Sequence, residues 1–131
     1  MKTLHINSHK QIEMIDITGD VCAAIRERKV KDGLAVIFTP HTTAAITINE
    51  NADPDVCRDL LMGINKFVPV QGGYHHLEGN SAAHIKSSLF GASETLIITN
   101  GEVVLGTWQG VYFCEFDGPR QRQVQIQVIG R

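Results

Sequence analysis

The chain has 131 residues and a mass of 14.4 kDa, a length typical of one domain. Hydrophobic residues make up 43% of it and charged residues 20%, a globular composition that excludes intrinsic disorder. Twelve Lys and Arg against fourteen Asp and Glu give a net charge of −2, which argues against a non-specific nucleic-acid binder. No apolar run approaches the ~18 residues of a membrane span, and no signal-peptide pattern opens the chain. We therefore expect a single cytoplasmic domain over residues 1–131, with no nucleic-acid or membrane partner.

The three cysteines, Cys22, Cys57 and Cys114, are odd in number and lack the paired spacing of a zinc motif. Their pattern indicates neither a disulfide framework nor a cysteine-bound zinc site.

In the N-terminal half, apolar patterns predict four strands, at residues 2–7, 12–17, 34–39 and 44–49. We expect the first two to form a hairpin around residues 8–10. Asp20 predicts the N-cap of a first helix, which ends near Asp32-Gly33. Asp53 and Pro54 are typical of a second helix start, and Pro69 ends that helix.

In the C-terminal half, Ser81 predicts the cap of a third helix that closes at Gly91. The Asn100-Gly101 dipeptide predicts a hairpin between strands at 96–99 and 103–105. Two more strands are expected at 111–116 and 123–129. Six to eight strands and three helices in this order predict a β-rich α+β domain, a two-layer sandwich of mostly antiparallel sheets with flanking helices.

Histidines supply the first candidate chemistry. Neutral imidazoles are common metal ligands, and three of them leave a coordination position open for water or substrate. His76 and His84 lie eight residues apart on either side of a helix start, and His41 ends a strand. Each of the three is equally explained as a surface or structural histidine, so the residues alone leave both interpretations open.

A second candidate is an anion site. The helix that begins near Ser81 offers free backbone N–H groups, and Lys86 follows one turn later. Together with Arg120, Thr42 and Thr43 these groups would suit a phosphate. The plain alternative is a capped helix with a solvated lysine.

Seven blocks of sequence resemble one known family. They are His41-Thr42-Thr43-Ala44-Ala45, Asn49-Glu50-Asn51, Asp53-Pro54-Asp55-Val56, Glu78-Gly79-Asn80, Ala83-His84-Ile85-Lys86, Leu105-Gly106-Thr107-Trp108-Gln109-Gly110 and Glu115-Phe116-Asp117-Gly118-Pro119-Arg120. In this order, from about residue 34 to the C-terminus, they are similar to the YjbQ-like family, which is described as secondary thiamine-phosphate synthase.

The resemblance implies a β-rich α+β fold that assembles as a homotrimer, and a divalent metal, zinc, bound by histidines. Carried over by position, the ligands here would be His41, His76 and His84. His76 is preferred to His75 because it holds the Tyr-x-His-x-Glu position that begins at Tyr74.

The implied reaction joins hydroxymethylpyrimidine diphosphate to a thiazole phosphate and releases pyrophosphate, so the partner is a small phosphorylated metabolite. Such a reaction needs cationic groups for the departing pyrophosphate. The resemblance suggests roles for seven residues: Lys86 and Arg120 for the anionic groups, Thr42, Asn80 and Gln109 for orienting substrate, and Glu50 and Glu78 for holding the histidines.

Two other functions fit the same residues. A metal-dependent hydrolase of a small phosphorylated metabolite would use the open metal position to activate water, with Glu78 or Glu50 as general base. A non-catalytic trimer that binds a metal or an anion is the other.

Overall fold

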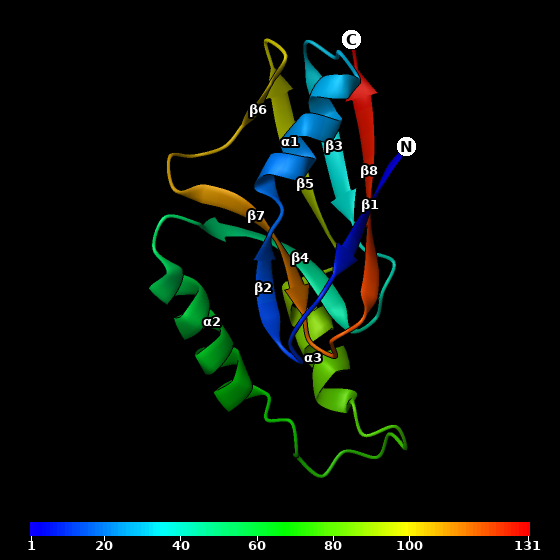
Figure 1. The fold of residues 1–131 in the computed structure, drawn as a ribbon, viewed down its shortest axis with the longest axis vertical. Coiled ribbons are helices and arrows are strands. Elements are labelled where there is room, and N and C mark those ends of the chain that lie inside the picture. The colour runs from blue at the N-terminus through cyan, green and yellow to red at the C-terminus, as the bar shows by residue number, and fades with distance from the viewer.

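The computed structural model describes residues 1–131, which form three helices and eight strands. The helices are α1 (Thr18–Glu27), α2 (Pro54–Phe67) and α3 (Ser81–Phe90). The strands are β1 (Lys2–Asn7), β2 (Glu13–Asp16), β3 (Gly33–Phe38), β4 (Ala44–Glu50), β5 (Ser93–Thr99), β6 (Glu102–Val104), β7 (Gln109–Glu115) and β8 (Gln121–Gly130). All strand pairs are antiparallel, and the strands divide into two sheets (Figure 1). The predicted β-rich α+β class is confirmed.

The larger sheet has five strands in the order β1-β8-β3-β5-β6. Every second residue of its long strand β8, from Arg122 to Val128, is buried, and the residues between them are half-buried or exposed. Ala35 and Ile37, the buried residues of β3, lie opposite Val128 and Ile126 in the register. Because side chains alternate between the two faces of a strand, one face of this sheet forms the core and the other faces outward.

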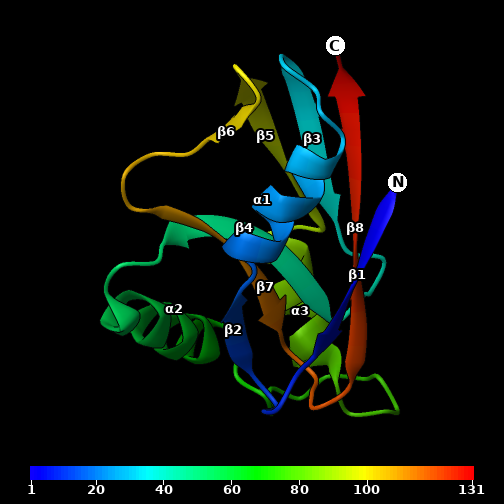
Figure 2. The ribbon, with the colours of Figure 1, turned by 45° about the horizontal axis from the view of Figure 1, so that its top comes forward.

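The smaller sheet has three strands in the order β2-β7-β4, and its central strand β7 is buried on both faces. Val111 and Phe113 belong to the main core, to which α1 contributes Ile25. On the opposite face, Tyr112 belongs to a second cluster with Ala83 of α3. The smaller sheet therefore lies between α1 and α3, an arrangement visible in Figure 2.

Helix α2 begins as the sequence predicts. A carboxylate oxygen of Asp53 accepts a hydrogen bond from the Asp55 N–H at 2.9 Å, and Pro54 occupies the first helical position. None of its residues is buried, so the helix lies along the side of the domain (Figures 1 and 2). Its apolar side and Phe90 of α3 line an open groove of about 470 Å³.

The predicted N-terminal hairpin is wrong. Strand β1 pairs with β8 and strand β2 pairs with β7, so the chain crosses from one sheet to the other between them. Ser8 holds this crossing: its hydroxyl donates to Glu115 at 2.6 Å and accepts from the Arg120 N–H at 2.9 Å. These partners are more than a hundred residues away, and they outweigh the local turn pattern.

Two predicted helix caps are also wrong. Helix α1 begins at Thr18, so Asp20 lies inside its first turn, and Asp16 accepts the Thr18 N–H at 2.9 Å instead. Helix α3 begins at Ser81, which makes Asn80 the N-cap residue. The Asn80 side chain makes no capping hydrogen bond, because its Nδ2 donates to an Asp117 carboxylate oxygen at 2.9 Å.

The predicted end of the first helix at Asp32-Gly33 is wrong: α1 ends at Glu27, because the backbone leaves the helical conformation at Lys29, which has a φ of 54°. The remaining predicted strands and helices agree with the structure to within a few residues. The β5–β6 turn is formed by Asn100 and Gly101, both with the positive φ that such a hairpin requires. None of the three helices combines the length and the apolar character that crossing a bilayer requires.

Candidate functional site

Connections from both sheets and the start of α3 line an open cavity of about 290 Å³, here called the polar cavity. None of its lining residues is hydrophobic. They are Pro40, His41, Thr42, Thr43, Glu78, Asn80, His84, Arg120 and Arg122. The 40–43 segment, the loop before α3 and the β7–β8 connection, which are distant in the sequence, therefore meet at one polar site.

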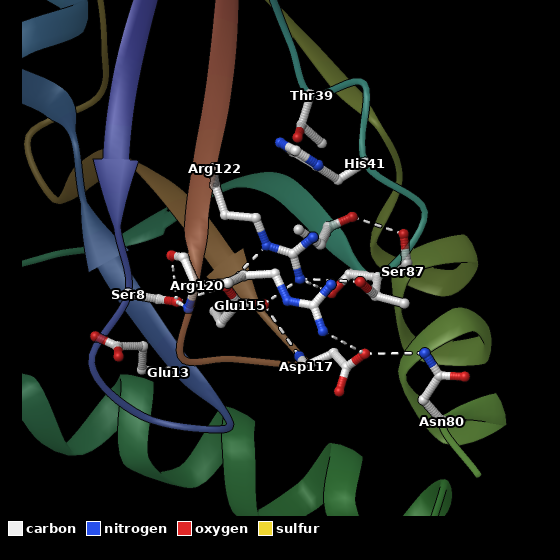
Figure 3. Close-up of polar contacts among 12 residues, drawn as sticks. Ser8, Glu13, Thr39, His41, Asn80, Ser87, Glu115, Asp117, Arg120 and Arg122 are labelled. Carbon is white, nitrogen blue, oxygen red and sulfur yellow. Dashed lines mark hydrogen bonds and ion pairs between the residues drawn. The ribbon is translucent and has the colours of Figure 1, made fainter. Parts of the chain in front are cut away.

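Arg122 is the buried cation of this cavity, with only 3% of its surface exposed. Its Nε donates to a Glu115 carboxylate oxygen at 2.9 Å, and its Nη2 donates to the other Glu115 oxygen and to the Thr43 hydroxyl at 2.9 Å (Figure 3). These bonds fix the guanidinium plane. They use Nε and Nη2 and leave Nη1 free to donate to a ligand.

Glu115 is fully buried and balances the Arg122 charge. Burial alone would raise the pKa of its carboxyl. The hydrogen bonds from Arg122, Ser8 and the Asp117 N–H outweigh that effect and hold the pKa below its usual range. Glu115 is therefore ionised at neutral pH.

Arg120 and Asn80 share one acceptor. An Asp117 carboxylate oxygen accepts from the Arg120 Nη2 at 3.1 Å and from the Asn80 Nδ2 at 2.9 Å (Figure 3). The Asn80 Oδ1 is the one buried side-chain polar atom in the structure with no hydrogen-bond partner. Because an unpaired buried acceptor costs about 1–3 kcal/mol, Oδ1 is suited to accept a hydrogen bond from a ligand.

His41 is held as a neutral ring. Burial lowers the pKa of its imidazole, and the Arg122 and Arg120 charges lower it further against the opposing effect of Glu115. Its Nε2 accepts a hydrogen bond from the Gln123 N–H at 2.9 Å. In a neutral imidazole with Nε2 as the acceptor, Nδ1 carries the proton and is a donor.

His76 and His84 are neighbours outside this hydrogen-bond network. Their rings meet edge to face with centroids 5.5 Å apart, and the His76 Nε2 lies 3.8 Å from Glu78. His84 lines both the polar cavity and an adjacent cavity of about 580 Å³ that also contains Tyr74 and His76. His84 thus connects the two cavities.

The three predicted metal ligands do not form a metal site in the single chain. No group of three or more His, Cys, Asp or Glu side chains lies close enough together to hold an ion. The Nε2 lone pair of His41 is already engaged by Gln123. A metal on His41, His76 and His84 would therefore require the three rings to move, and we derive no chemical step through one.

The other predicted site residues divide into two groups. Thr42, Glu78, Asn80, His84 and Arg120 lie with His41 at the polar cavity. The structure does not bring Lys86, Glu50 and Gln109 there.

Lys86 is 1% exposed, and its Nζ donates to the Asn65 Oδ1 of α2 at 2.6 Å. Burial lowers the pKa of this amine. Its ammonium group therefore links α3 to α2 and does not line the polar cavity.

Glu50 and Gln109 are cross-strand partners at the end of β4 remote from Thr43. Seven residues of strand separate them from the cavity side by about 20 Å. Gln109 accepts the Gly106 N–H at 2.8 Å and so stabilises its own turn.

Arg122 and Thr43 bond to each other at the polar cavity, yet the sequence pattern predicted no role for Arg122 and a strand start at residue 123. The sequence does contain an indication that Arg122 is a buried site residue. Arg122 continues the inward alternation of Val124, Ile126 and Val128, and an arginine at a buried strand position requires an ionic partner.

The fold and the cavity together define a class: a β-rich α+β domain with a polar cavity lined by two arginines. The model of the family described as UPF0047 protein YjbQ-like matches residues 2–131, and the chain belongs to this family.

Relatives and solved structures agree. The chain is 55% identical over 125 residues to a UPF0047 protein of Methanocaldococcus jannaschii, which covers 95% of this chain and 91% of the relative. It is 53% identical to the UPF0047 protein YugU of Bacillus subtilis over 99% of both chains. A crystal structure of an uncharacterised YjbQ/UPF0047-family protein from Clostridium acetobutylicum superposes with a TM-score of 0.97 at 54% identity, covering 98% of this chain and 100% of that one.

Glu115→Gln tests the buried ion pair. Removing the carboxylate leaves the Arg122 charge buried without a partner, so we expect a loss of about 3–5 kcal/mol in the free energy of unfolding at pH 7. In the wild type, the stability due to Glu115 is present above the unfolded-state pKa of about 4.3 and is lost as the pH falls through the lower folded-state pKa. Urea denaturation between pH 7 and pH 3 measures both effects.

The double variant Glu115→Gln/Arg122→Met is the control, because it removes both charges and should recover much of the lost stability. A single variant as stable as the wild type would contradict the assigned role of the pair.

Lys86→Met tests the position of the buried lysine. A methionine of similar length removes an ammonium group that has no carboxylate partner, so we expect a free energy of unfolding within about 1 kcal/mol of wild type, or higher. Pyrophosphate binding, measured by calorimetry on the same variant, should be unchanged. A tenfold loss of binding would instead place Lys86 at the ligand.

Proposed function

We propose that this chain is an enzyme that binds a small phosphorylated metabolite in the polar cavity and catalyses group transfer from it. One observation carries the proposal: a cavity with no hydrophobic lining residue presents two guanidinium groups, Arg120 and Arg122, beside two imidazoles. Guanidinium groups bind phosphate oxygens through paired N–H donors. A cavity of about 290 Å³ is at the small end of metabolite sites.

The reaction we propose is the one that the sequence resemblance implies. Hydroxymethylpyrimidine diphosphate is joined to a thiazole phosphate, the carbon–oxygen bond to the diphosphate breaks, and pyrophosphate leaves with the electron pair. Enzymes accelerate such a departure by placing fixed donors where negative charge develops. The family members compared above carry descriptions without an activity, so support for this particular reaction rests on the cavity's chemistry and the resemblance.

Within this proposal, Arg122 Nη1 and Arg120 donate to the leaving pyrophosphate oxygens. The buried Glu115 clamp keeps the Arg122 plane fixed, so no reorganisation is needed during the reaction. The neutral His41 ring donates through Nδ1, and the exposed Thr42 hydroxyl supplies a further donor. Asn80 Oδ1 accepts a hydrogen bond from an amino or hydroxyl group of the substrate.

Hydrolysis of a phosphorylated metabolite is a second candidate, and Glu78 favours it. Glu78 lines the polar cavity and lies 3.8 Å from the His76 imidazole, so this carboxylate is placed to take a proton from an attacking water. The two functions differ in an observable way: a hydrolase releases phosphate or pyrophosphate from the diphosphate substrate alone, whereas the transferase requires the thiazole phosphate.

Zinc binding and homotrimer assembly are separate parts of the proposal. Two of the three imidazoles, His76 and His84, already touch, and the third would have to release Gln123. A homotrimer is consistent with the unburied α2 and its apolar groove, which a single chain leaves uncovered.

Arg120→Gln tests the anion site. Loss of one charge-assisted donor should weaken pyrophosphate binding by about tenfold to a hundredfold and lower pyrophosphate release from the two thiamine precursors to a similar extent. Calorimetry with pyrophosphate and a coupled release assay measure the two effects. Arg58→Gln is the matched control, because Arg58 pairs with Asp55 on the exposed side of α2. Equal binding by both variants and the wild type would disprove the assignment.

Metal removal tests the independence of the anion site. Since Arg120 and Arg122 supply its donors, we expect protein treated with EDTA to bind pyrophosphate within about twofold of untreated protein. Metal content is measured in parallel on protein purified without a histidine tag, beside His84→Ala. Loss of binding that zinc restores in the wild type, but not in His84→Ala, would show that the imidazoles gather around a metal that the ligand requires.

A further inference from the structure

A second cavity, of about 580 Å³, meets the polar cavity at His84 and has a different chemistry. Four of its seven lining residues carry a flat ring, Tyr74, His75, His76 and His84, and it is called the ring cavity here. None of the seven is a lysine, arginine, aspartate or glutamate, whereas two arginines and a glutamate line the polar cavity. The charged groups of a ligand therefore belong in the polar cavity, and the ring cavity suits an uncharged, flat part of the same ligand.

The ring of Tyr74 is fixed by its neighbours in the chain. Its hydroxyl donates to the Pro69 carbonyl oxygen at 2.7 Å. Gly72 leaves room for the same end of the ring, because a Cβ at position 72 would lie 2.7 Å from the Tyr74 Cζ. Tyr74 is therefore held in place before a ligand binds, and a preorganised wall lowers the entropic cost of binding.

The His76 and His84 rings are perpendicular. Their centroids lie 5.5 Å apart, and the angle between their planes is 88°. A flat ligand ring that stacks on one of them therefore meets the edge of the other, and both arrangements are favourable for aromatic pairs. An imidazole edge also carries two nitrogens that can bond to the nitrogens of a heterocycle. The pair therefore favours a nitrogen heterocycle over a plain hydrocarbon ring.

One wall of the ring cavity belongs to the loop that joins α2 to α3, at the bottom of Figure 1, and the other belongs to α3. All hydrogen bonds and ion pairs made by residues 70–79 lie within residues 69–79: Tyr74 to Pro69, Gly79 to His76 at 3.2 Å, and His76 to Glu78. No such bond ties the loop to α3 or to either sheet. The loop can therefore adjust to a ligand that bridges the two walls.

We propose that the ring cavity binds the heteroaromatic ring of the substrate while the polar cavity binds its phosphate groups, and that Tyr74 selects for a flat ring. This rests on the function proposed above and gives it a substrate class: an organic phosphate or diphosphate that carries an uncharged nitrogen heterocycle. His84 lines both cavities, so it lies where the two parts of the ligand join.

Calorimetry with three probes tests the proposal on the full chain: pyrophosphate, hydroxymethylpyrimidine diphosphate and cyclohexylmethyl diphosphate. Both organic probes carry a six-membered ring one carbon from the diphosphate, but only the pyrimidine is flat. The wild type should bind the pyrimidine probe about tenfold more tightly than the cyclohexyl probe. Tyr74→Leu should reduce this ratio to less than about threefold and leave pyrophosphate affinity within about twofold, because Tyr74 does not line the polar cavity.

Two further variants separate the ring of Tyr74 from its other contributions. Tyr74→Phe keeps the ring, loses the bond to Pro69, and should keep most of the preference for the pyrimidine probe. Leu77→Ala is the matched control, because Leu77 belongs to the same loop, is fully exposed and lines neither cavity. Circular dichroism verifies that each variant folds.

A preference for the pyrimidine probe that is lost in Tyr74→Leu alone supports the proposal. Equal binding of the two organic probes by the wild type overturns it, and so does a preference that survives in Tyr74→Leu or disappears in Leu77→Ala. Pyrophosphate binding distinguishes the two levels of the argument. A wild type that binds pyrophosphate without preferring the pyrimidine overturns the ring cavity alone, whereas a wild type that binds none of the three probes overturns the proposed function as well.

Discussion

The buried pair of Arg122 and Glu115 is the interaction on which the architecture of this domain depends. It joins β8 of the larger sheet to β7 of the smaller one, and its remaining bonds reach Ser8 at the β1–β2 crossing and Thr43 at the start of β4. The β1–β2, β3–β4 and β7–β8 connections therefore all bond to one ion pair. Such a pair is a weak source of stability because desolvation offsets the Coulombic attraction. Its role here is to fix geometry. It sets where the two sheets meet, and it orients the Arg122 guanidinium so that Nη1 is left without a protein partner.

The balance of charges around the polar cavity determines how the cavity could bind an anion. Arg122 is neutralised by Glu115, and Arg120 is partly neutralised by Asp117 at 3.1 Å. In the proposed function, attraction for a phosphorylated ligand would therefore come mainly from oriented N–H donors that have no protein partner, such as Arg122 Nη1, and less from excess positive charge. Burial, helped by the same two cations, lowers the pKa of His41 and keeps its ring neutral, so a third donor is available at physiological pH. A site of this kind favours ligands whose oxygens match the donor positions, and it selects by geometry.

Local chemistry allowed the sequence to predict much of the fold. The Asp53-Pro54 helix start and the Asn100-Gly101 turn each involve neighbours in the chain, and both are confirmed. The β1–β2 crossing depends on Ser8 bonding to residues more than a hundred positions away, which no local pattern reveals. Lys86 was misplaced for another reason: with Ala82, Ala83 and Ser87 it lies on the buried face of α3, and its Nζ bonds to Asn65 of α2. Glu50 is close in sequence to His41, Thr42 and Thr43, but it lies at the opposite end of β4 from them.

Strand β8 links the positions of two polar groups at the cavity, Arg122 and His41. Its period of two places Arg122 inward and Gln123 outward, one residue apart, and the Gln123 backbone holds His41. A rigid strand paired on both sides cannot shift one of these residues without the other. Pairing with β1 and β3 therefore restrains the positions of His41 and Arg122 together. Preorganisation of the donors, which the proposed chemistry needs, follows from this strand pairing as well as from the Arg122–Glu115 pair.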